Sequence, residues 1–234
     1  MKYPHDVQDE WFQSLIATAE ATEWGKKHDY KSILTPEEYK NRVPIQEYDD
    51  IKVYVDRMIK GEQNILWPSE IKWFAKSSGT TSDRSKFIPV SMEALEECHY
   101  QGGKDMFSIY CNNRPENQLF KGKTVVLGGS SQINNFNPDS YYGDLSSILI
   151  RNLPFWAELK RTPNVEVTLN PNFDEKIENI AQLTIKENVT SLAGVPTWNI
   201  VMAKRILEIT GKDNLLEVWP NLEFYGHGGV SFKP

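Results

Sequence analysis

The chain of 234 residues carries 26 Lys and Arg against 32 Asp and Glu, a net charge of -6, and 39% of its residues are hydrophobic. This charge argues against a general binder of nucleic acid or of anionic membranes, although it does not exclude a local basic site. The length suffices for a substantial core without disulfides or a structural metal.

Residues 1–65 are predicted to form a helical amino-terminal segment packed on the main domain. Apolar residues recur at helical spacing over residues 7–27, so a helix is expected there. Thr35 offers an N-cap hydroxyl, a proline follows it at the first helical position, and Glu38 places an acid in the first turn of a second, short helix. A further helix is expected over residues 49–60, and a glycine ends it.

Residues 66–234 are predicted to alternate strands with helices. The expected strands are short apolar runs at residues 71–75, 87–90, 124–127, 189–193 and 222–225. The expected helices are one of about twenty residues that opens at Ser91, and two more over 173–187 and 198–210. This alternation predicts an α/β fold with a largely parallel sheet flanked by helices. The segment Gly128–Tyr142, rich in Gly, Ser and Asn, is expected to be a long loop.

The cysteines and the start of the chain bear on where the protein works. Cys98 and Cys111 fit neither a disulfide framework nor a metal-ligand spacing. The opening residues lack a basic region followed by an apolar one, and no apolar run approaches the length of a membrane span. We therefore expect a cytoplasmic protein with reduced thiols that binds neither membranes nor nucleic acid.

Two patterns in the sequence resemble parts of known sites but do not meet the requirements of those sites. The segment Gly122-Lys123-Thr124 resembles the end of a Walker-type phosphate loop, but the first glycine of that motif would fall at Asn117. A strand rather than a helix is also expected after it. The four histidines are scattered, with none at i, i+4 from another, so no metal site formed by side chains of this chain is expected.

One segment, residues 77–86, carries a pattern suited to phosphate. It places six hydroxyl side chains around one glycine, between two predicted strands. Hydroxyls and backbone N–H groups in such a turn form an anion-binding concavity, Gly79 lets the backbone approach a ligand, and Lys86 supplies a compact positive charge. The alternative is a polar surface turn, but an exposed hairpin favours Asn-Gly or Asp-Gly. The predicted phosphate-binding residues are Ser77, Ser78, Gly79, Thr80, Thr81, Ser82 and Lys86.

The stretch SSGTTSDRSKFIP resembles the phosphate loop of adenylate-forming enzymes, the superfamily of acyl-CoA synthetases and luciferases. Its form is most similar to that of the auxin-responsive acyl acid amido synthetases of plants and their bacterial relatives. ATEWGKKHDY, VPIQEYDDIKVYVDRMIKGE, AGVPTW and YGHGGVSFKP resemble the bacterial branch in the same order, so the resemblance covers nearly the whole chain. The loop departs from the general superfamily form, because Ser82 replaces a glycine and one additional residue precedes Lys86. That departure fits the amido synthetase branch.

The resemblance implies a reaction in two steps that uses ATP and Mg²⁺. ATP and a small-molecule carboxylic acid would give an acyl-adenylate and pyrophosphate, and an amine or amino acid would then displace AMP to form an amide. Lys86 would be the catalytic residue, because it would stabilise the negative charge of the departing pyrophosphate. Two alternatives stay open, an enzyme of the acyl-CoA-ligase type and a non-catalytic nucleotide-binding or scaffold domain. The sequence does not give the acid, the amine or the oligomeric state.

The resemblance also implies an adenine-binding segment and an acyl pocket. The expected adenine-binding residues are Gly228, Gly229 and Val230, although a simple turn after a strand explains them equally well. The expected acyl pocket lies just beyond a strand end, where open parallel sheets place ligands. Its residues are Val195, Pro196, Thr197 and Trp198. For Trp198, packing in the core is the alternative.

The family's acidic motif, which helps hold the metal–ATP complex, and its mobile carboxy-terminal domain would both follow Pro234. Residues 66–234 are therefore expected to be a partial ATP-binding adenylation domain. We expect the chain to be an amino-terminal fragment that is inactive by itself.

Overall fold

The computed structural model describes residues 3–77, 86–129 and 133–228. Contacts divide the chain into two compact units, the first formed by Met1–Met92 with Asn134–Tyr142, and the second by Glu93–Ile133 with Gly143–Pro234. This division differs from the boundary expected at residue 65. The reason is that buried side chains of the opening helices, such as Met58, share a core cluster with Phe74 of the first strand.

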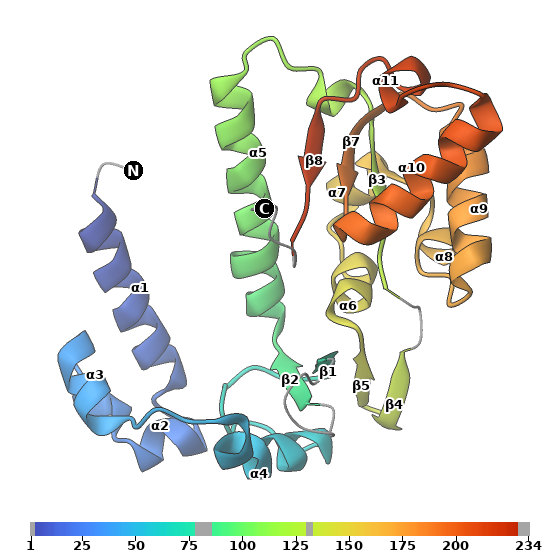
Figure 1. The fold of residues 1–234 in the computed structure, drawn as a ribbon. Coiled ribbons are helices and arrows are strands. Elements are labelled where there is room, and N and C mark those ends of the chain that lie inside the picture. The colour runs from blue at the N-terminus through green and yellow to red at the C-terminus, as the bar shows by residue number, and fades with distance from the viewer. Residues whose placement is uncertain (1–2, 78–85, 130–132, 229–234) are drawn as a thin grey trace. The chain divides into compact units, whose positions relative to one another are not determined.

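The first unit opens with helices, as expected from the sequence. They are α1 (Pro4–Ala19), α2 (Glu23–Lys27), a 3-10 helix (Tyr30–Ser32), α3 (Pro36–Arg42) and α4 (Tyr48–Ile59) (Figure 1). Gly61 follows α4 with a φ of 100°, a conformation that glycine adopts without strain.

The prediction of a single helix over residues 7–27 is wrong, because the chain turns at Thr22 between α1 and α2. The buried Thr22 hydroxyl donates to the Ala19 carbonyl at 2.7 Å and accepts from the Gly25 backbone N–H at 2.9 Å. These bonds cap α2 and separate it from α1. Glycine is required at position 25, since a Cβ there would lie 2.1 Å from the Ala19 oxygen.

The cap expected at Thr35 is present and reciprocal. The Thr35 hydroxyl accepts from the Glu38 backbone N–H at 3.2 Å, and the Glu38 carboxylate accepts from the Thr35 backbone N–H at 3.1 Å. Two backbone donors of the first turn of α3 are thereby satisfied.

We predict that Thr35→Ala lowers the free energy of unfolding by about 1 kcal/mol, because the Glu38 N–H loses its acceptor. Urea denaturation of the purified protein measures this change. Thr18→Ala, at an exposed position inside α1, is the control for replacing threonine by alanine. Equal midpoints for wild type and Thr35→Ala would contradict the prediction.

The described strands of the first unit form a four-stranded sheet in the order β2-β1-β5-β4. They are β1 (Trp73–Ser77), β2 (Lys86–Val90), β4 (Asn134–Asn137) and β5 (Ser140–Gly143). The strands β1 and β2 pair antiparallel, and so do β4 and β5. The β4–β5 hairpin occupies the second half of the segment Gly128–Tyr142 and ends one residue beyond it, so the expectation of one long loop there is wrong. The turn forms at Asn137, whose side-chain oxygen accepts from the Asp139 N–H at 2.9 Å.

The second unit contains the parallel sheet that the sequence predicts. Its described strands follow the order β6-β3-β7-β8 and are β6 (Arg161–Thr162), β3 (Lys123–Val126), β7 (Val189–Ala193) and β8 (Phe224–Gly226). Each neighbouring pair is parallel. This is the crossover arrangement of an α/β fold.

Helices connect these strands. They are a π-helix (Ala94–Tyr100) that continues into α5 (Gln101–Asn113), a 3-10 helix (Leu119–Lys121), α6 (Leu145–Arg151), α7 (Phe155–Lys160), α8 (Val165–Thr168), α9 (Phe173–Thr184), α10 (Pro196–Thr210) and α11 (Leu215–Val218). None of the helices in the described ranges combines the length and the apolar character that a membrane crossing requires.

The residues of β3 alternate between the two faces of the parallel sheet. Val125 is fully buried and shares a core cluster with Ile180 of α9 and Met202 of α10, so these two helices cover one face (Figure 1). Thr124 and Val126 belong to the opposite face, because successive side chains of a strand point to opposite sides. There they line a cavity.

Candidate functional site

The strands β1 and β2 bring the two ends of the predicted phosphate loop together. Ser77 is the last residue of β1 and stands opposite Lys86, the first residue of β2, in the antiparallel register. The residues Ser78, Gly79, Thr80, Thr81 and Ser82 lie outside the described part of the chain. The structure thus fixes the lysine and the serine at the base of the loop.

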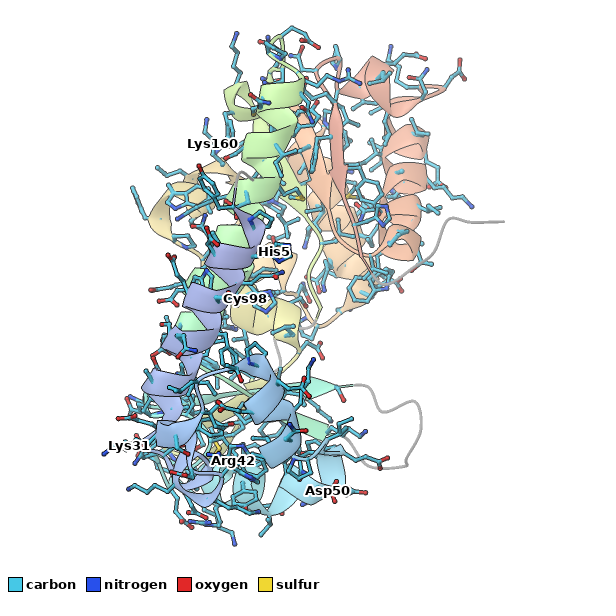
Figure 2. The ribbon with its side chains drawn as sticks, turned by 90° about the vertical axis from the view of Figure 1, so that its left-hand side faces the viewer. His5, Lys31, Arg42, Asp50, Cys98 and Lys160 are labelled. Carbon is cyan, nitrogen blue, oxygen red and sulfur yellow. The ribbon has the colours of Figure 1, made fainter. Side chains whose placement is uncertain are left out.

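Tyr48, the first residue of α4, contacts the base of the loop in two ways. Its hydroxyl accepts from the Phe87 N–H at 2.9 Å and lies 3.3 Å from the Phe87 carbonyl oxygen, to which it donates. Its ring lies 5.6 Å from the Lys86 Nζ, within the range of a cation–π interaction. The same first turn of α4 contains Asp50, labelled in Figure 2, whose carboxylate accepts from the Glu47 N–H at 2.8 Å.

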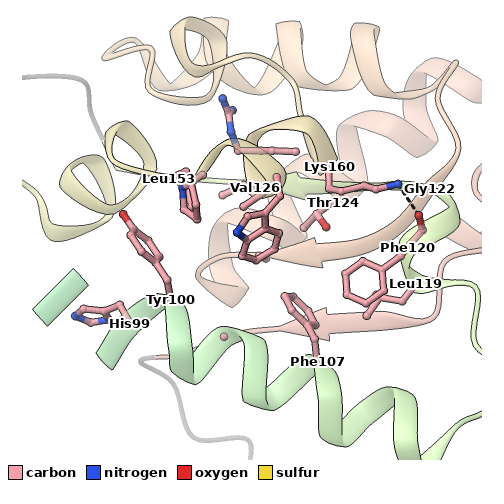
Figure 3. Close-up of a pocket in the computed structure, with 16 residues that line it drawn as sticks. His99, Tyr100, Phe107, Leu119, Phe120, Gly122, Thr124, Val126, Leu153 and Lys160 are labelled. Atoms are coloured by element: carbon pink, nitrogen blue, oxygen red, sulfur yellow. Dashed lines mark hydrogen bonds between the residues drawn. The ribbon is translucent and has the colours of Figure 1, made fainter. Parts of the chain in front are cut away.

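A cavity of about 200 Å³ lies within the second unit, between α5, the parallel sheet and α7. Figure 3 shows Phe107 of α5 directed toward the strands, and Tyr100, the last residue of the π-helix before α5, directed toward α6, where its hydroxyl bonds the Leu149 carbonyl. Thr124 and Val126 of β3 and Ala193 of β7 form the sheet side. The remaining lining residues are His99, Gly103, Leu119, Phe120, Gly122, Leu153, Pro154, Trp156, Ala157, Lys160 and Arg161. Sequence analysis missed this cavity.

The polar groups of the cavity are largely paired within the protein. The Tyr100 hydroxyl donates to the Leu149 carbonyl at 2.9 Å, and burial raises the pKa of Tyr100 to about 12, so the phenol stays neutral. The Lys160 ammonium donates to the Phe120 carbonyl at 2.6 Å (Figure 3). Arg161 is buried and bonds the Glu158 carboxylate. The interior therefore presents an apolar, aromatic surface to a guest.

A buried lysine holds the backbone where β3 ends. Lys176 of α9 is 4% exposed, and its ammonium donates to the carbonyls of Gly128 at 3.1 Å and of Gly129 at 2.7 Å. Burial lowers the pKa of Lys176, and the charge of Asp144 opposes this shift. A Cβ at Gly129 would lie 2.6 Å from an Asp144 carboxylate oxygen, so a larger residue there would displace the Asp144 side chain. The adjacent glycines were a visible signal in the sequence, whereas the lysine was not.

Comparison with known proteins settles the family. The whole chain, residues 1–234, matches the GH3 family N-terminal domain. The chain belongs to the GH3 family. The resemblance inferred from the sequence motifs is thereby confirmed.

Relatives of the GH3 chain are named as amino acid synthetases and amido synthetases. Jasmonoyl–L-amino acid synthetase JAR6 of Nicotiana attenuata is 26% identical over 210 residues, which are 86% of this chain and 36% of that protein. Indole-3-acetic acid-amido synthetase GH3.2 of Arabidopsis thaliana is 29% identical over 94 residues, 40% of this chain and 17% of that protein. The chain spans about a third of the length of JAR6.

A solved structure shares the fold of the GH3 chain. The structure of a GH3.15 acyl acid amido synthetase superposes with a TM-score of 0.67 at 18% sequence identity, over 87% of this chain and 36% of that one. This likeness confirms the predicted mixed α/β fold with a parallel sheet.

The GH3 chain places the residues predicted for the acyl pocket at the start of α10. Val195 is the N-cap, Pro196 is the first helical residue, and all four residues follow Ala193, which lines the cavity. The Trp198 ring lies 6.1 Å from that of Phe173 and packs against the core. This contact supports the packing alternative for Trp198, and the described cavity is lined by other residues.

The residues predicted to bind adenine follow β8. Gly228 is exposed, and a Cβ added there would meet no atom within 4 Å. Gly229 and Val230 lie outside the described residues. Among the residues that the structure describes, no cluster of three His, Cys, Asp or Glu side chains is placed to hold a metal ion.

Proposed function

We propose that the GH3 chain is part of an ATP-dependent acyl acid amido synthetase. In the first step a carboxylate oxygen attacks the α-phosphorus of ATP, which gives an acyl-adenylate and releases pyrophosphate. In the second step the nitrogen of an amine or amino acid attacks the acyl carbon, which gives an amide and releases AMP. The observation that carries this proposal is the pairing of Ser77 with Lys86 at the base of the hydroxyl-rich loop, in a chain of the GH3 family.

The first unit would bind the triphosphate. Hydroxyls and backbone N–H groups of residues 77–82 would contact phosphate oxygens, and Lys86 would stabilise the charge that develops on the departing pyrophosphate. ATP brings Mg²⁺ bound to its own phosphates, and the ion would neutralise part of their charge. Since the described residues contain no cluster suited to a metal, we assign no protein ligand to it.

The second unit would bind the acid. An apolar cavity of about 150 Å³ can hold benzene, so the cavity of about 200 Å³ has room for a single ring or a short alkyl chain. Its paired polar groups favour an apolar guest. Val126 and Ala193 carry the cavity to the carboxyl ends of β3 and β7, where open parallel sheets bind ligands. We place the apolar part of the acid inside and its carboxyl group at those strand ends.

Two site assignments taken from the family resemblance complete the proposal. Gly228 to Val230 would lie beside adenine, and Val195 to Trp198 would border the acid at the end of β7. One GH3.15 structure is a complex with 2,4-DB, which supports a small-molecule acid as the substrate class. The free thiols of Cys98 and Cys111 favour the cytoplasm as the place of action.

Pyrophosphate release from ATP by the full-length protein that contains the GH3 chain, measured across a panel of carboxylic acids, tests the function. We expect release that depends on the acid, and an amide when an amino acid is added, detected by mass spectrometry. A thioester formed only with coenzyme A would favour the acyl-CoA-ligase type. ATP binding without pyrophosphate release for any acid would favour a nucleotide-binding or scaffold role.

A further inference from the structure

We propose that Tyr48 is a positioning residue that holds Lys86 in place for the triphosphate. This inference rests on the phosphate role proposed for Lys86. The tyrosine would touch neither ATP nor the reacting atoms, and would act through the lysine. Its hydroxyl would hold the backbone next to Lys86 and its ring would orient the Lys86 ammonium, and different substitutions of Tyr48 separate these two effects.

The Tyr48 hydroxyl fixes the backbone next to Lys86. Among the described strands, β2 lies at the edge of its sheet, and an edge strand presents backbone groups that pair with no neighbouring strand. At Phe87 the Tyr48 hydroxyl serves both of these groups, the N–H at 2.9 Å and the carbonyl at 3.3 Å. The first turn of α4 thereby takes the place of a neighbouring strand at the residue after the lysine.

The Phe87 side chain anchors the other face of the same strand. Its ring lies 4.9 Å from Phe136 and 5.3 Å from Tyr142, edge to face in both pairs. Because side chains alternate along a strand, Lys86 belongs to the opposite face. The backbone at the start of β2 is thus held by an aromatic cluster on one face and by a hydroxyl at its edge, which leaves the lysine side chain as the adjustable part.

The Tyr48 ring orients the Lys86 ammonium without neutralising it. A carboxylate at this position would form an ion pair that a phosphate would have to displace. The face of an aromatic ring attracts the cation while the full positive charge stays available. No ion pair found in the described ranges involves Lys86. The ring therefore limits the rotamers of a flexible side chain and so lowers the entropy lost when ATP binds.

A double-mutant cycle on ATP affinity tests this inference. Calorimetry would compare the wild-type full-length protein that contains the GH3 chain with Tyr48→Leu, Lys86→Ala and the double variant of the same protein. We expect Tyr48→Leu to raise the Kd for ATP about two- to fivefold and to leave the Kd for adenosine unchanged. In the Lys86→Ala background the Tyr48 substitution should have no further effect on the Kd for ATP.

Two further variants separate positioning from folding. Tyr48→Phe keeps the ring and loses both hydrogen bonds, so it should bind ATP more tightly than Tyr48→Leu, even if its melting temperature falls. Tyr54→Leu is the matched control, because Tyr54 also lies in α4 and contacts a different lysine, Lys27, through its hydroxyl at 2.9 Å and its ring at 5.3 Å. It should leave ATP affinity unchanged.

The outcomes distinguish the two proposals. If Lys86→Ala weakens ATP binding but Tyr48→Leu does not, or if the two effects simply add, the positioning role is wrong and the phosphate role stands. Equal losses in Tyr48→Phe and Tyr48→Leu would also overturn the role of the ring. If Lys86→Ala leaves ATP affinity unchanged, the phosphate role itself fails.

Discussion

Replacing Lys86 by alanine is expected to weaken ATP binding about ten- to a hundredfold, with less effect on adenosine. A hydrogen bond to a charged group is worth about 1.5–3 kcal/mol, and the substitution removes one such contact with the triphosphate. Calorimetric titration of the full-length protein that contains the GH3 chain, with ATP and with adenosine, measures both affinities. The difference between the two ligands isolates the phosphate contribution.

Lys76→Ala is the matched control for this experiment. Lys76 lies in the same hairpin, opposite Phe87 in the register, and therefore on the other face of the sheet from Lys86. Lys76→Ala removes one positive charge, as Lys86→Ala does, but keeps the proposed contact of Lys86 with the triphosphate. The affinity for ATP should therefore stay within about twofold of wild type. Equal losses for the two variants would mean that net charge, rather than a bound phosphate, explains the result for Lys86.

The elements that sequence predicted well are those with local signals. Thr35 and Glu38 form their reciprocal cap from within one turn, and Gly61 ends α4 through its own backbone conformation. The strand over Val189–Ala193 was predicted at its observed bounds, because a short run rich in β-branched and small residues is typical of a buried strand. These signals need no knowledge of the rest of the chain.

The sequence predicted other features wrongly, because they depend on a single side-chain interaction or on residues distant in the chain. The break at Thr22 depends on a hydroxyl that bonds both neighbouring helices, whereas the apolar spacing continues across it. The outer strand of the β4–β5 hairpin, Asn134–Asn137, contains three asparagines and is largely exposed, so its pattern is that of a loop. Aromatic contacts stabilise the hairpin, such as the stacking of Phe136 on Tyr142, whose ring centroids lie 4.2 Å apart.

The candidate site likewise has features that could be predicted from the sequence and features that could not. That Ser77 and Lys86 lie at the two ends of a polar turn could be predicted, because a strand was expected on each side of it. Their phosphate role stays a prediction. Tyr48 could not be predicted, since it lies 39 positions from the Phe87 backbone that it bonds. The cavity joins residues from α5, β3, α7 and β7, which lie far apart in the sequence. Only the packing of these elements leaves a space between them.

The second large effect is expected at Gly103, which lines the cavity from α5. Gly103→Leu should lower kcat/KM for bulky acids about ten- to two-hundredfold relative to small acids, because the new side chain occupies space that the acid would fill. Folding should survive, since a Cβ at this position meets no atom within 4 Å and leucine favours a helix more than glycine does. Pyrophosphate release by the full-length protein with a graded series of acids measures the change in preference.

Gly102→Leu completes the experiment, because it makes the same substitution one residue earlier in α5. Gly102 is exposed, a Cβ there also meets no atom within 4 Å, and the residue does not line the cavity. It should gain the same helix propensity and keep the wild-type order of acids. A shift in acid preference in Gly103→Leu alone would place the acid in the cavity. The same shift in both variants, or in neither, would exclude the cavity as the acid site, and residues Val195–Trp198 at the start of α10 would become the position to test.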